Sequence, residues 1–82
     1  MSHIFLIFTG TRATLDAEDL LIEQGYEVKT LGKPQGWEGG CGLALRIESD
    51  KLERILALLE EKGNSPIKAA PPPEHPIKRR LI

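Results

Sequence analysis

The sequence holds one cysteine, Cys41, and it lies in the glycine-rich run Gly39-Gly40-Cys41-Gly42. A cysteine is nucleophilic as its thiolate, and a helix N-terminus or a nearby positive charge favours that form. Glycines on both sides leave backbone amides uncovered, so an anion or a second sulfur could approach closely. These neighbours favour a reactive thiol. The alternative stays open, because a free cysteine is also among the residues most often buried as a small apolar side chain.

A second segment with possible chemistry is Gly10-Thr11-Arg12, between an apolar run and a helical pattern. Free amides at a helix N-terminus bind anions, so the segment could hold a phosphate or a carboxylate, as in an acylphosphatase-like enzyme. Simple capping by Thr11 with a solvated Arg12 explains the same residues. No general base is evident, because His3 begins the first apolar run and His75 lies among prolines.

The patterning around these segments predicts six elements in an α+β fold. Alternation predicts strands and apolar residues at helical spacing predict helices. We expect a strand over 3–9, a helix over 12–24 with Thr11 as its N-cap, strands over 26–31 and 41–48 around a loop over 32–40, a helix to residue 62 capped by Ser49 or Asp50, and an edge strand over 65–70. The order β-α-β-β-α-β is typical of a ferredoxin-like sandwich, a four-stranded antiparallel sheet with two helices on one face.

This topology predicts a contact between the two candidate segments. The first and third strands are the central antiparallel pair of the fold, so the end of 3–9 lies beside the start of 41–48. Cys41 has the parity of Leu43 and Leu45, which we assign to the helix side. Its sulfur should therefore point toward the N-terminus of the first helix. The residues predicted to stabilise the thiolate or an anion are Gly10, Thr11, Arg12, Gly40 and Gly42.

The other side of the predicted sheet suggests a different function. Phe5 and Ile7 would be apolar there and Gly42 and Ala44 small, so a flat apolar patch would face solvent and mark a contact. A partner, a second copy or the chain's own tail could cover it. The alternative to a thiol function is thus a non-catalytic small-molecule-binding or protein-interaction module that dimerises through this face.

Composition bounds the partners and the architecture. The 82 residues allow one folded domain, 1–70, with a net charge of −3, followed by a Pro-rich basic tail, 71–82, with a net charge of +2 and the cluster Lys78-Arg79-Arg80. The overall charge of −1 argues against nucleic acid as a partner. The third strand also lacks the stacking aromatics of an RNA-recognition module on its open side.

The single cysteine and the short apolar runs exclude further classes. One thiol cannot form an intrachain disulfide, a zinc knuckle or the two-thiolate site of a copper chaperone, so we expect no metal and no cofactor. The longest apolar run, 4–8, is far shorter than the roughly 18 residues of a membrane span, and no charged leader or cleavage site flanks it. A reduced thiol fits a cytoplasmic location.

The run Cys41-Gly42-Leu43-Ala44-Leu45-Arg46, with Lys33-Pro34 before it, resembles the selenium/sulfur carrier protein-like family of small bacterial and archaeal proteins. The resemblance covers about residues 3–68, and Trp37-Glu38 in the loop departs from the family pattern. It implies that Cys41 carries sulfur or selenium as a persulfide or selenosulfide, with Gly42 and Arg46 in the motif. It also implies donor and acceptor proteins as partners, and a carrier or accessory protein more than a stand-alone enzyme.

Trp37 and Arg46 are the remaining candidates, as a loop lid or as partner contacts. Trp37 could fold over Cys41, anchor a partner, or be exposed with neither role. Arg46 has the opposite parity to Cys41 on the predicted strand, so we expect no direct ion pair between the two side chains.

Overall fold

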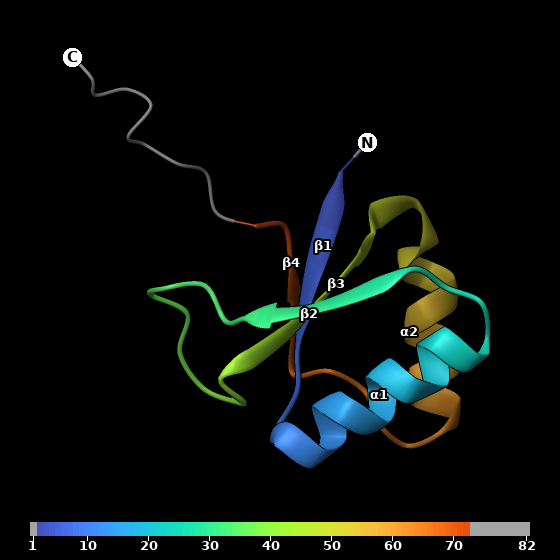
Figure 1. The fold of residues 1–82 in the computed structure, drawn as a ribbon, viewed down its shortest axis with the longest axis horizontal. Helices are drawn as coiled ribbons and strands as arrows, with labels where there is room; N and C mark the ends of the chain where they lie inside the picture. Colours follow the sequence, from blue (N-terminus) through green and yellow to red (C-terminus); the bar gives the residue numbers. More distant parts are fainter. Residues whose placement is uncertain (1, 73–82) are drawn as a thin grey trace.

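The computed structural model describes residues 2–72. Along this part of the chain lie β1 (His3–Ile7), α1 (Thr11–Glu23), β2 (Val28–Gly32), β3 (Leu43–Glu48), the short 3-10 turn η1 (Ser49–Lys51), α2 (Leu52–Glu61) and β4 (Lys68–Ala70). The strands form one sheet in the order β2-β3-β1-β4, with every neighbouring pair antiparallel. Both helices lie on one side of it (Figure 1), which confirms the ferredoxin-like α+β fold. The predicted tail cluster Lys78-Arg79-Arg80 lies outside the described residues.

The core between sheet and helices follows the predicted alternation. Side chains at even positions of the first strand segment and at odd positions of β3 meet the apolar stripes of α1 and α2. The fully buried members are Leu6, Phe8, Ala17, Leu21, Leu45, Ile47, Ile55 and Leu59. Within residues 2–72 no helix is long and apolar enough to cross a membrane.

Two predicted helix caps are wrong. Helix α1 begins at Thr11 itself; Gly10 is the N-cap, and no side chain caps this end. Thr11 is inside the first turn, where its hydroxyl faces Cys41 instead of the helix amides. At the second helix the chain first forms η1, so Ser49 and Asp50 precede the cap position, which Lys51 occupies without a side-chain hydrogen bond. The Ser49 hydroxyl pairs with that of Ser2 at 2.9 Å.

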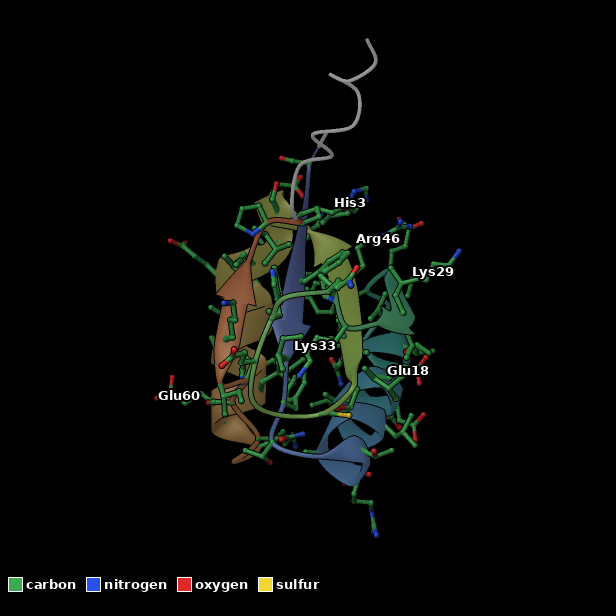
Figure 2. All side chains as sticks on the ribbon, turned by 90° about the vertical axis from the view of Figure 1, so that its left-hand side faces the viewer. His3, Glu18, Lys29, Lys33, Arg46 and Glu60 are labelled. Carbon is green, nitrogen blue, oxygen red and sulfur yellow. The ribbon has the colours of Figure 1, made fainter. Side chains whose placement is uncertain are left out.

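The sheet face opposite the helices is covered by the chain itself. Phe5, Ile7 and Ala44 form a second apolar cluster with exposures of 9%, 1% and 0%, and Trp37 and Leu31 pack against them. The prediction of a solvent-facing patch is therefore wrong. Residues 33–42, which we call the strap, cross this face. The two ends of the strap are joined by a hydrogen bond in which the Lys33 amide donates to the Gly42 carbonyl at 2.8 Å. Figure 2 looks onto this face, with Lys33 in the loop in front of the sheet.

Candidate functional site

Cys41 lies at the end of the strap, two residues before β3. Regular pairing in β3 begins only at Leu43, opposite Gly32 of β2. The Cys41 amide nevertheless donates to the Phe8 carbonyl at 2.8 Å, which fixes this residue against the chain that leaves β1. The predicted proximity of the two segments is thus present. The cysteine is buried, with 5% of its surface exposed.

Hydrogen-bond donors surround the sulfur. The Leu43 amide donates to Sγ at 3.3 Å, and the Thr11 Oγ1 lies 3.6 Å from it. Because Thr11 is the first residue of α1, the sulfur lies beside the positive end of that helix dipole. A thiolate accepts hydrogen bonds more strongly than a thiol, so each of these groups favours the ionised form.

The net effect is a lowered pKa of the Cys41 thiol. The largest cause is a hydrogen bond from the Thr14 hydroxyl; burial opposes the shift, and the Thr11 hydroxyl and the Leu43 and Gly42 amides add to it. In the structure the Thr14 Oγ1 donates its proton to the Gly10 carbonyl at 2.9 Å. A hydroxyl carries one proton, so ionisation of the sulfur favours turning that proton from the carbonyl toward Sγ.

The two glycines next to Cys41 play different structural roles. Gly40 has a φ of +72°, and a Cβ there would lie 2.6 Å from the Phe8 carbonyl oxygen, so only glycine fits. That oxygen is the acceptor of the Cys41 amide. Gly42 is exposed, has nothing within 4 Å of its Cβ position, and supplies an amide to the sulfur. Gly40 thus permits the close contact with Phe8 that positions Cys41, whereas Gly42 leaves the space next to Cys41 free of a side chain.

The Arg12 side chain, predicted to add a positive charge near the thiol, pairs within its own helix. Its side chain is 90% exposed and its Nε pairs with Asp16 at 3.5 Å, one turn along α1. The groups that lower the pKa of Cys41 are hydrogen-bond donors. Gly10 acts through its backbone, because its carbonyl accepts the Thr14 amide at 3.1 Å as well as the Thr14 hydroxyl.

Trp37 and Arg46 lie away from the sulfur. The Trp37 ring meets Phe5 edge-to-face at a centroid distance of 6.0 Å, and the Lys68 Nζ lies 4.7 Å above it. This places Trp37 on the sheet face opposite the one toward which Sγ points. Arg46 pairs with Phe5 and Lys29 in the strand register. Figure 2 shows Arg46 beside Lys29 and His3, toward the opposite end of the sheet.

Sequence reasoning missed Thr14. It lies one turn after Thr11 on α1, is fully buried, and makes the largest contribution to the lowered pKa of the thiol. The spacing Thr-x-x-Thr was the available signal, since residues three apart share a helix face. Once Thr11 is placed next to Cys41, Thr14 must lie on the same side of the helix.

We expect Thr14→Val to shift the reactivity of Cys41 to higher pH. Only the thiolate reacts with iodoacetamide, and a lowered pKa means that the alkylation rate rises at lower pH than for an unperturbed cysteine. Removing the hydroxyl at constant shape should move the midpoint upward. Thr14→Ser, which keeps the hydroxyl, is the control. The role assigned to Thr14 fails when the valine and serine variants titrate alike.

One family model matches most of the chain. The model of a protein family described as "Putative Se/S carrier protein-like" matches residues 3–71. No curated protein and no solved structure matches the chain. Among residues 2–72 there is no group of three His, Cys, Asp or Glu side chains arranged to hold a metal ion.

Proposed function

Because the chain belongs to the Se/S carrier protein-like family, we propose that Cys41 carries a sulfur or selenium atom from a donor protein to an acceptor protein. The observation that supports this most directly is the set of donors around Sγ. The Thr11 and Thr14 hydroxyls and the Leu43 and Gly42 amides lower the pKa of the thiol. A cysteine with only a packing role has no need for these groups.

The carrier cycle consists of two thiolate attacks. In the first, the Cys41 thiolate attacks the outer sulfur of a donor persulfide, R–S–SH; the new S–S bond gives Cys41–S–SH and the donor leaves as R–S⁻. In the second, an acceptor thiolate attacks the outer sulfur of Cys41–S–SH and leaves the Cys41 thiolate behind. Sulfur is passed on without a net oxidation, so no redox cofactor is required. Selenium in place of the outer sulfur gives the selenosulfide version.

The surroundings of Cys41 suit both attacks. The Cys41 sulfur is a thiolate before the first attack and again after the second, and the same hydroxyls and amides stabilise the thiolate in both steps. The exposed Gly42 leaves the neighbouring backbone without a side chain. A second sulfur can therefore approach this otherwise buried residue from that side.

The absence of a second cysteine favours carriage over disulfide exchange. The chain has one cysteine, so no resolving thiol is available to close an internal disulfide after the first attack. The Cys41 persulfide can therefore react only with a thiol of another molecule, as a carrier requires. We also propose a cytoplasmic location, because a reducing compartment keeps such a thiol free.

The proposal is tested by titration and mass spectrometry of the folded protein. We expect alkylation of Cys41 with a midpoint below that of an unperturbed cysteine, and a mass increase of about 32 Da, one sulfur atom, after incubation with a persulfide donor. Treatment with excess thiol should reverse the gain. Cys41→Ser is the control and should gain no mass. An ordinary or raised pKa without any adduct would show that Cys41 only fills space.

A further inference from the structure

Helix α1 leaves two large apolar side chains exposed along one side. Leu15 is 41% exposed and Ile22 is 56% exposed; with Ile67 they are the exposed large apolar residues of the described chain. Positions seven apart are two turns apart and lie above one another on a helix. Glu18 falls between them. Neither side chain is needed for the core, because the inner side of α1 is formed by Thr14, Ala17 and Leu21.

The N-terminal end of this row of α1 residues lies next to the Cys41 thiol. Thr11 is four residues before Leu15, so it continues the row, and its Oγ1 lies 3.6 Å from the Cys41 Sγ. At 1.5 Å per residue, the row from Thr11 to Ile22 is about 16 Å long. A protein seated along it would reach Cys41 with the part of its surface that covers the N-terminus of α1.

The charge on α1 defines what can bind there. The helix carries Asp16, Glu18, Asp19 and Glu23 against a single basic residue, Arg12, which is paired with Asp16. Figure 2 shows Glu18 at the outer side of α1. Exposed apolar residues among acidic ones are complementary to a surface with an apolar centre and basic residues around it.

We propose that this row, Leu15, Glu18 and Ile22 of α1, is the docking surface for the proteins that exchange sulfur with Cys41, and that those proteins present basic residues around an apolar contact. The inference rests on the proposed carrier function, since a carrier must bring another protein's cysteine to its own. The row supplies an apolar anchor and electrostatic attraction, and Thr11 at its end fixes where the partner's sulfur arrives.

The test uses thiol–disulfide exchange and does not depend on persulfide formation. Two peptides have the same apolar residues and one cysteine activated as a 2-pyridyl disulfide; one carries lysines and the other glutamates at the flanking positions. The Cys41 thiolate attacks the peptide sulfur, a mixed disulfide forms, and the released thiopyridone is measured. We expect the lysine peptide to react about tenfold faster at low salt, with the difference shrinking at high salt.

Two charge variants locate the effect. Glu18→Lys with Glu23→Lys reverses two charges on α1, at Glu18 within the proposed surface and at Glu23 next to Ile22. Glu60→Lys with Glu61→Lys makes the same change in net charge on α2, and Figure 2 shows Glu60 on the opposite side of the molecule from Glu18. We expect the first pair to abolish the preference for the lysine peptide and the second pair to retain most of it. Leu15→Ser with Ile22→Ser should slow both peptides, and a small uncharged disulfide should react equally with every variant.

Equal effects of the two charge variants, or no preference in the unchanged protein, would overturn the docking surface. These outcomes are separate from failure of the carrier function. A protein that shows the peptide preference but gains no sulfur from a persulfide donor would retain the surface and lose the carrier function. A protein that loads sulfur without any preference would do the reverse.

Discussion

Replacing Gly40 by alanine should destabilise the protein by about 3 kcal/mol or more, from two separate causes. The φ of +72° at this position is one that an L side chain adopts only with strain, on the order of 1–2 kcal/mol. In addition, the new Cβ would lie 2.6 Å from the Phe8 carbonyl oxygen and 2.8 Å from carbons of Ile7 and Ile67. The carbonyl cannot move away freely, because it accepts the Cys41 amide.

Two neighbouring glycines make this prediction a matched series. Gly39 has a φ of +80° but nothing within 4 Å of its Cβ position, so Gly39→Ala should show the backbone strain alone. Gly42 has neither feature, and Gly42→Ala should change stability by less than about 1 kcal/mol. Urea unfolding of the three variants measures each effect. Close contact at Gly40 is disproved when its variant is no less stable than the Gly39 variant.

The same substitution should also raise the pKa of the thiol. A Cβ at position 40 would lie too close to the Phe8 carbonyl oxygen, so we expect the strap and Cys41 to shift away from Phe8. The Thr11 hydroxyl, now 3.6 Å from the sulfur, and the Thr14 hydroxyl should then stabilise the thiolate less. Alkylation of the folded Gly40→Ala protein should therefore shift to higher pH, whereas Gly39→Ala should leave the midpoint near its original value.

The arrangement of the strands could be predicted from alternation, and the meeting of Thr11 with Cys41 followed from it. Once β1 and β3 are taken as the central antiparallel pair, the end of one must lie beside the start of the other. The side toward which Cys41 points followed from the parity of Leu45 and Ile47, both now in the core. These features depend on backbone periodicity, which a single sequence displays.

Contacts that depend on side-chain competition could not be predicted in this way. Thr11 was expected to cap α1, but a hydroxyl near a buried sulfur has a second acceptor, and only the fold brings that acceptor within reach. Arg12 has a local partner in Asp16, four residues later, and its side chain pairs with that carboxylate. The roles proposed for Gly10, Gly40 and Gly42 at the thiolate remain predictions.

The position of Trp37 was the least predictable part of the chain. It lies in a loop with four glycines, where no periodicity specifies a direction. Its position follows from a requirement of the sheet: Phe5, Ile7 and Ala44 would otherwise be exposed on the face away from the helices. The strap satisfies this requirement within one chain, which removes the need for a second copy to cover the face.

Replacing Trp37 by alanine should therefore both destabilise the protein and cause it to self-associate. The indole packs against Phe5 and lies under the Lys68 ammonium group. Removing a large aromatic from a core costs about 3–5 kcal/mol, and because Trp37 is only partly buried we expect about 2–4 kcal/mol. The newly exposed cluster of Phe5, Ile7 and Ala44 would then be an apolar patch available to another molecule.

Circular dichroism measures the stability of this variant, because Trp37 is the only tryptophan and its fluorescence signal is lost with it. Sedimentation velocity over a range of concentrations measures the association. Trp37→Phe keeps an aromatic ring on Phe5 and should remain nearly as stable as the original protein. Lys68→Ala removes only the cation–π contact, which should cost about 0.5–1 kcal/mol.

The combined result separates two descriptions of the open sheet face. If the strap is the permanent cover of this face, only the alanine variant associates, and it does so through the sheet. If the face is instead a natural interface between two copies, the unchanged protein should already associate, and removing Trp37 should alter an existing equilibrium. The burial of Phe5 and Ile7 by the chain's own strap leads us to expect association in the Trp37→Ala variant alone.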